Sequence, residues 1–211
     1  MSQTNLRGEK AYLVPPESGT SQHHTLALEL VLHNLQRQER PRVLDLGRAI
    51  GANVSFLTHY SCKLFIADLF QTLRGHRDGL DWDAMVLDRT LAEHLPYRDQ
   101  SCFDLIFAWD LLNYLDRQEL EVLGRHLSRL CKRSGLLFAM LSTRKQIPDR
   151  PTDFRILDLE TLAYDNPSKM RRPCPLYKEP DLARLMSDFE VETSFLLRNG
   201  MQEYVLALRP S

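Results

Sequence analysis

The sequence lacks an excess of charge of either sign, a closely spaced cysteine pair and a long apolar run. Its 211 residues carry 27 Lys and Arg against 28 Asp and Glu, so the overall charge attracts neither nucleic acid nor an anionic membrane. The four cysteines are scattered without a C-x-x-C pair, which argues against disulfides and a metal site. No stretch is apolar enough for a signal peptide or a membrane span. We therefore expect a cytoplasmic protein without metal, membrane or nucleic acid as a partner.

Apolar runs of strand length alternate along the chain with helical patterns. Strands are predicted at residues 42–46, 62–70, 83–88, 103–110 and 136–141, and helices at 25–36, 52–60, 117–135 and 179–188. Such alternation is typical of an open, mostly parallel sheet with helices on both faces. The length suits a single domain over residues 1–211, with residues 1–40 as a helical cover and 142–180 as an irregular excursion over the strand ends.

The end of the chain departs from this alternation. Residues 189–209, "FEVETSFLLRNGMQEYVLALR", read as two strands joined by Asn199-Gly200, and this dipeptide is the strongest short-range signal for a tight hairpin. A hairpin inserts its last strand antiparallel to its neighbours. We therefore predict a three-layer, doubly wound α/β fold with seven strands, mostly parallel with the last strand antiparallel.

Four of the predicted strands have an aspartate at their end or within two residues of it: Asp45, Asp68, Asp88 and Asp110. Ligands of doubly wound sheets bind outside the carboxyl ends of the strands, so these carboxylates are candidate ligand-binding groups. Asp68 lies at the end of the second predicted strand, 17 residues after the Gly51 of the glycine turn, and could accept hydrogen bonds from both hydroxyls of a ribose. Any one of these aspartates could instead simply cap a turn or a helix.

Several stretches together resemble the class I S-adenosylmethionine-dependent methyltransferases, which have a Rossmann-like fold. "VLDLGRAIGAN" is similar to the family's D/E-x-G-x-G-x-G motif, with Ala49 in place of the middle glycine. "FIADLF" is similar to the strand whose terminal acid holds the ribose, and "LPYRDQSCFDLIFAWDLLNYL" to the fourth-strand region. The resemblance covers roughly residues 41–208, and the fourth-strand block is its most specific part.

The resemblance implies an enzyme that binds S-adenosylmethionine and methylates an unidentified acceptor, either a small molecule or a protein side chain. Residues 142–180 would then lie near the acceptor. Asp45, Gly47 and Gly51 would lie at the methionine end, and Arg48 could bind the methionine carboxylate or face solvent. Asp68 would hold the ribose. The full set of implied cofactor-binding residues is Asp45, Gly47, Arg48, Ala49, Gly51, Asn53, Asp68, Leu69, Asp88, Arg89, Trp109 and Asp110.

Two questions stay open at the level of sequence. Trp109 could line the cofactor or be a packing residue, and no residue identifies itself as a catalytic base. Ala49 would weaken cofactor binding if its backbone needed a positive φ, so a catalytically silent binding or assembly module is the alternative function. A nicotinamide-dependent oxidoreductase is rejected, because Gly47 and Gly51 cannot supply the spacing of G-x-G-x-x-G.

Overall fold

The computed structural model describes residues 21–77, 83–95, 102–166 and 168–210. Its centre is a six-stranded sheet with the strand order β10-β11-β5-β4-β2-β3. These strands are β2 (Arg42–Asp45), β3 (Lys63–Ile66), β4 (Phe103–Trp109), β5 (Cys131–Ser142), β10 (Phe189–Leu196) and β11 (Met201–Leu208). The predicted fold class is confirmed.

The direction of the strands follows the predicted hairpin. β2 pairs parallel with both β3 and β4, and β4 pairs parallel with β5. β11 runs antiparallel to both of its neighbours, β10 and β5. Asn199 and Gly200 form the turn before it, where Gly200 has a φ of +83° and the Asn199 side chain accepts a hydrogen bond from the Met201 N–H. The Asn-Gly dipeptide thus determines the direction of the last strand.

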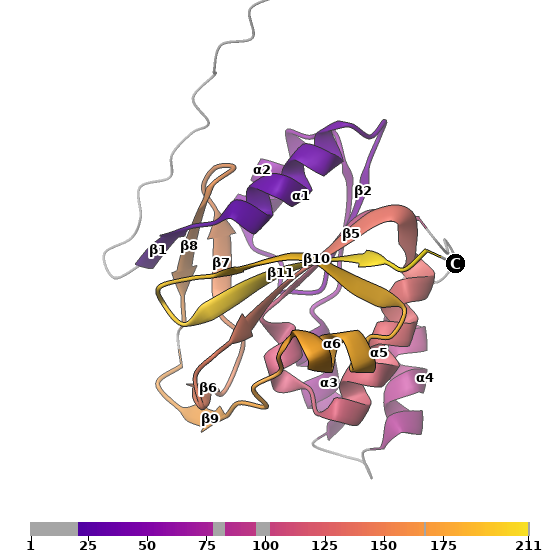
Figure 1. Cartoon of the computed structure of the whole chain (residues 1–211), viewed down its shortest axis with the longest axis vertical. Coiled ribbons are helices and arrows are strands. Elements are labelled where there is room, and N and C mark those ends of the chain that lie inside the picture. The colour runs from indigo at the N-terminus through magenta and orange to yellow at the C-terminus, as the bar shows by residue number, and fades with distance from the viewer. Residues whose placement is uncertain (1–20, 78–82, 96–101, 167, 211) are drawn as a thin grey trace, which may run out of the picture.

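Helices cover both faces of the sheet, giving three layers (Figure 1). α1 (Leu26–Gln36) and α2 (Gly51–Thr58) lie on one face, and α3 (Leu69–Arg77), α4 (Ala84–His94), α5 (Arg117–Leu130) and α6 (Glu179–Leu185) lie on the other. Alternate residues of each strand point into two separate apolar clusters, because successive side chains of a strand face opposite sides. In β4, Ile106 belongs to the cluster under α3–α6 and Phe107 to the cluster under α1.

The prediction of a strand at residues 83–88 was wrong, because this segment begins α4. Asp83 is the N-cap, and its carboxylate accepts hydrogen bonds from the backbone N–H groups of Met85 and Val86. Leu87 and Leu91 are buried one helical turn apart and belong to the cluster beneath α3–α6. The central sheet of the described residues therefore has six strands rather than the predicted seven. β3 is the strand at one edge of this sheet.

The predicted irregular excursion, residues 142–180, instead contains four short strands. β7 (Asp153–Ile156) and β8 (Thr161–Asp165) form a three-stranded sheet with β1 (Ser21–His24), and β6 (Gln146–Pro148) pairs with β9 (Arg171–Pro173). β1 also adds a strand to the cover that was predicted to be helical. Each of these strands has at most five residues.

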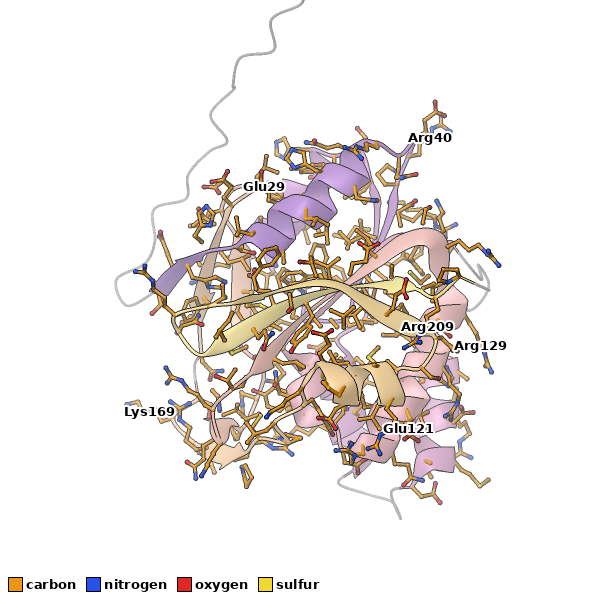
Figure 2. All side chains as sticks on the ribbon, viewed as in Figure 1. Glu29, Arg40, Glu121, Arg129, Lys169 and Arg209 are labelled. Atoms are coloured by element: carbon orange, nitrogen blue, oxygen red, sulfur yellow. The ribbon has the colours of Figure 1, made fainter. Side chains whose placement is uncertain are left out.

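Charged side chains such as Arg40 and Lys169 lie at the periphery of the molecule (Figure 2). Within the described ranges, no helix combines the length and the apolar character needed to cross a membrane.

Candidate cofactor site

A cavity of about 300 Å³ lies at the carboxyl ends of β2 and β4. Its walls come from the chain after β2, the beginning of α3, the end of β4 and residues 150–154, which precede and begin β7. The first three walls are separate in sequence but meet here because parallel strands end at the same edge of a sheet. The fourth wall belongs to the excursion. The volume of the cavity is at the lower end of the range for small-molecule sites.

Asp45 holds the first wall together at the end of β2. Its Oδ1 accepts hydrogen bonds from the Gly47 N–H and from the Trp109 indole N–H, both at 2.8 Å. The side chain is 2% exposed. Burial raises the pKa of Asp45 to about 6, although these two hydrogen bonds oppose the shift. Asp45 therefore orders the turn by joining it to the end of β4.

Trp109 is both a packing residue and a wall of the cavity, so the two alternatives for it are compatible. Its ring stacks on Phe107 and Phe154, with interplanar angles of 8° and 11°, and it also lines the cavity. Its backbone has a φ of +47°, in the left-handed region that is uncommon for a bulky residue. A Cβ at Gly47 would lie 2.9 Å from the indole Cδ1. Gly47 is thus required by the chain's own tryptophan.

Asp68 follows β3 and caps α3. Of the two roles considered for it, ribose binding and helix capping, the structure shows the second. Its Oδ1 accepts a hydrogen bond from the Gln71 N–H at 3.1 Å, the geometry of an N-cap. Asp68 also lines the cavity. A carboxylate can accept several hydrogen bonds, so capping the helix leaves acceptor capacity for a ligand.

Asp110 lies directly after β4 and is 4% exposed. Its Oδ2 accepts a hydrogen bond from the Thr152 N–H at 3.0 Å, whereas its buried Oδ1 has no hydrogen-bond partner within the described part of the protein. Burial raises the pKa of Asp110 to about 7, the nearby Asp153 adds to the shift, and the hydrogen bonds from Thr152 oppose it. The Asp110 carboxyl, in a residue that lines the cavity, therefore gains or loses its proton near neutral pH.

Residues 150–154 form one wall of the cavity, and hydrogen bonds from neighbouring residues hold this segment in place. The Arg48 guanidinium donates to the Asp153 carboxylate at 2.9 Å. The Asn53 amide donates to the Phe154 carbonyl, and its oxygen accepts from the Ile156 N–H, both at 2.8 Å. Arg48 and Asn53 both line the cavity, but their hydrogen bonds in the structure are to the excursion.

Six predicted cofactor-binding residues do not line the cavity, and one of them, Asp45, supports the turn from inside the fold. Ala49 is exposed and its φ is not in the left-handed region. Gly51 begins α2, and Leu69 is buried beneath the start of α3. Asp88 and Arg89 lie on α4, where Asp88 accepts a hydrogen bond from His126 Nε2 at 2.8 Å. The last two were placed at the cofactor because residues 83–88 were predicted as a strand. Residues 96–101, which belong to the fourth-strand block quoted above, lie outside the described residues.

The sequence predicted that residues 142–180 lie over the strand ends, but it identified neither the individual excursion residues nor the α3 residues that line the cavity. Phe70, Gln71 and Arg74 lie on the first turns of α3, and Arg150, Pro151 and Thr152 come from the excursion. The α3 residues could have been found from Asp68, because residues two to six positions after a helix cap lie on its first turns. No local signal in the sequence places residues 150–152 beside them.

Comparisons with known proteins agree with this geometry. A family model described as a methyltransferase domain matches residues 44–139, which include the glycine turn, Asp68 and Asp110. No curated protein matches the chain.

A solved structure shares this fold. A protein of Pyrococcus horikoshii OT3, PH0226, aligns over 87% of this chain and 88% of its own at 17% identity, with a TM-score of 0.52. The Burkholderia thailandensis 1,6-didemethyltoxoflavin-N1-methyltransferase, solved with S-adenosylhomocysteine, has 14% identity over 87% and 77% of the two chains and a TM-score of 0.49. A Clostridium acetobutylicum S-adenosylmethionine-dependent methyltransferase has 13% identity over 87% and 92%, with a TM-score of 0.46. Residues 44–139 therefore match a methyltransferase-domain family model, and the chain shares a Rossmann-like fold with the PH0226 protein.

Proposed function

We propose that the cavity at the ends of β2 and β4 binds S-adenosylmethionine, and that the protein transfers its methyl group to an acceptor, either a small molecule or a protein side chain. The observation that carries this proposal is the position of Asp68, a strand-end carboxylate on the wall of a cavity that begins at the Gly47 turn. An acid at this place is suited to accept hydrogen bonds from ribose hydroxyls.

The residues present fit this cofactor. Asp68 retains acceptor capacity beyond its helix cap, and Asp45 fixes the turn of Gly47 from inside the fold. The cofactor supplies an electrophilic methyl group on a sulfonium sulfur, and its transfer depends mainly on alignment. The protein provides alignment through groups that are held in place. The Trp109 ring stacks on Phe154, and the Asp110 carboxylate accepts a hydrogen bond from Thr152. The Asn53 side chain holds the excursion through its hydrogen bond from Ile156.

Calorimetric titration with S-adenosylhomocysteine, the demethylated product, tests the proposal. Asp68→Asn is the most informative variant, because asparagine caps helices about as well as aspartate and only the charge is lost. We expect affinity to fall roughly 10- to 150-fold, the equivalent of one charge-assisted hydrogen bond, with little change in Tm. Asp83→Asn is the matched control, since Asp83 caps α4 in the same way and does not line the cavity. Equal affinity for Asp68→Asn and wild type would remove Asp68 from the site.

The second candidate function is a methyltransferase fold that acts as a binding or assembly module without catalysis. The observation that favours it is that Arg48 and Asn53, both expected to contact the cofactor, are bound by residues of the excursion. Absence of binding heat with wild-type protein at millimolar S-adenosylhomocysteine would support this function over the enzyme.

A further inference from the structure

A two-stranded ribbon beside the cavity carries a local excess of positive charge. We define the β6–β9 ribbon as residues 144–150 and 168–174, which contain the paired strands β6 and β9. Six of its residues are basic and one, Asp149, is acidic, whereas the whole chain has 27 basic and 28 acidic residues. The basic residues are Arg144, Lys145, Arg150, Lys169, Arg171 and Arg172. The balanced charge of the chain therefore hides a cationic surface.

Most of these cations have no counter-ion within the protein. The Arg150 Nε lies 3.9 Å from Oδ1 of Asp149. The other five basic side chains have no carboxylate within 4.0 Å in the part of the chain that the structure describes. Four of these five are exposed: Arg144, Lys145, Lys169 and Arg171. Neighbouring cations without counter-ions create a positive potential that attracts an anionic partner.

The ribbon is fixed against the body of the protein, so its charges are held in place. Ile147 and Arg172 are cross-strand partners and share one face of the ribbon. Ile147 is buried, and the Arg172 guanidinium lies over the Tyr114 ring of η1 (Leu111–Tyr114), 5.6 Å from its centroid. The Tyr114 hydroxyl donates to the Arg150 carbonyl at 2.8 Å. A surface held in this way loses little conformational freedom when a partner binds.

The ribbon also adjoins the mouth of the cavity. Arg150 belongs to the ribbon and lines the cavity, and the exposed Arg74 of α3 adds a cation to another wall. The volume of about 300 Å³ suits one small ligand, so with a cofactor bound the acceptor has to reach the methyl group from the surface. From Arg150 the ribbon leads outward to the periphery, where Lys169 lies (Figure 2).

We propose that the β6–β9 ribbon docks an acidic segment of a protein, and that this protein carries the methyl acceptor. The inference rests on the proposed function and narrows its acceptor to a protein side chain. The ladder from Lys145 to Asp149 is about 14 Å long at 3.4 Å per residue, which matches about five residues of an extended peptide. Asp and Glu side chains along such a peptide meet the cations of the ribbon.

The docked segment is held by side-chain charges rather than as an added strand. The Asp149 N–H donates to the Met170 carbonyl and the Cys174 N–H to the Lys145 carbonyl, so the backbone groups of the residues between them point to the open edges. Pro148 and Pro173 are such residues, and a proline offers no N–H to another strand. Charge complementarity therefore supplies the recognition.

A peptide fits this surface better than a nucleic acid does. The ribbon residues include no aromatic side chain, and unpaired bases bind largely by stacking on aromatic rings. The chain has a pI of about 6.7, whereas domains that bind nucleic acid commonly exceed a pI of about 9. Outside the ribbon, acidic residues outnumber basic ones and repel a long polyanion. A short acidic segment needs only the local patch.

Fluorescence anisotropy at about 20 mM salt, where surface charges are weakly screened, tests the docking surface. The probe is a fluorescein-labelled, amidated peptide of five Glu-Gly repeats, and its neutral counterpart has five Gln-Gly repeats. We expect wild type to bind the acidic peptide with a Kd of about 1 mM or below. The ribbon variant is Lys145→Gln, Lys169→Gln and Arg171→Gln combined. It should bind roughly 3- to 150-fold more weakly, the range for three exposed ion pairs.

The control variant removes three exposed cations elsewhere, as Arg37→Gln, Arg40→Gln and Arg129→Gln combined. Arg40 and Arg129 lie far from Lys169 (Figure 2). This variant has the same net charge as the ribbon variant and should bind the acidic peptide within about twofold of wild type. Equal weakening in both variants would overturn the proposal, as would failure of wild type to bind the acidic peptide or equal binding of the neutral one.

Two further arms separate the alternatives. Hexathymidylate carries five phosphates, and tighter binding of this probe than of the acidic peptide would overturn the proposal in favour of a nucleic-acid partner. Saturating S-adenosylhomocysteine should leave the acidic peptide bound, since methyl transfer needs both ligands at once, and mutual displacement would refute the acceptor role. Failure of the proposed function is seen separately: without binding heat for S-adenosylhomocysteine, retained peptide binding would leave the docking surface and refute the methylation.

Discussion

Replacing Asp45 by asparagine should make the stability of the protein less dependent on pH. The carboxyl is 2% exposed and its pKa is about 6, against an ordinary 3.8 that the unfolded chain should restore. Because the pKa is raised on folding, the folded state binds the proton more tightly than the unfolded state does. The contribution of this group to stability is therefore present in full below pH 4 and is lost as the pH rises through 6.

The expected size follows from the shift, since one pKa unit corresponds to 1.36 kcal/mol. A shift of about two units means that wild type should lose up to about 3 kcal/mol of unfolding free energy, relative to Asp45→Asn, between pH 4 and pH 7. Asparagine can still accept hydrogen bonds from Gly47 and Trp109 through its side-chain oxygen. The Asp110 carboxyl shifts in the same direction, but it is present in both proteins and cancels in the difference.

The assay is urea unfolding of both proteins at unit steps from pH 4 to pH 7, followed by far-UV circular dichroism. Trp109→Phe is a useful companion, because it removes the indole N–H that lowers the pKa of Asp45. The loss of stability in that variant should move to higher pH. Unfolding free energies for wild type and Asp45→Asn that stay parallel across this range would refute the reasoning.

Two further predictions concern the glycine turn. Gly47→Ala should destabilise the protein by roughly 1–3 kcal/mol through overpacking, because the added Cβ would lie 2.9 Å from the Trp109 ring. Gly51→Ala adds its Cβ to open space, so its thermal stability should equal or exceed that of wild type. Equal Tm values for the two variants would contradict this prediction. Ala49→Gly should change S-adenosylhomocysteine affinity less than about threefold, because Ala49 is exposed and needs no positive φ. It should lower stability by about 0.4–1 kcal/mol through the unfolded state. Calorimetry showing a tenfold gain in affinity would restore the original view of Ala49 as a weakened position.

The sequence by itself determined the elements whose signals are local. The Asn199-Gly200 turn and its two strands, and the β2 strand with its terminal Asp45, depend on neighbouring residues, and they are found where predicted. Asp68 and Asp110 were placed near a ligand by a topological rule, and the rule needs only the order of parallel strands. Where that order was predicted wrongly, at residues 83–88, Asp88 and Arg89 were misplaced with it.

Only the tertiary structure decided what these residues contact. A cap and a ligand-binding carboxylate look the same in sequence, and Asp68 proves to be a cap that also faces the cavity. The Arg48–Asp153 ion pair and the hydrogen bonds of Asn53 to Phe154 and Ile156 join residues about one hundred positions apart, a separation that no local sequence pattern spans. The raised pKa of Asp110 arises from burial under residues 150–154. Burial is a property of how distant segments pack together, and no local pattern encodes it.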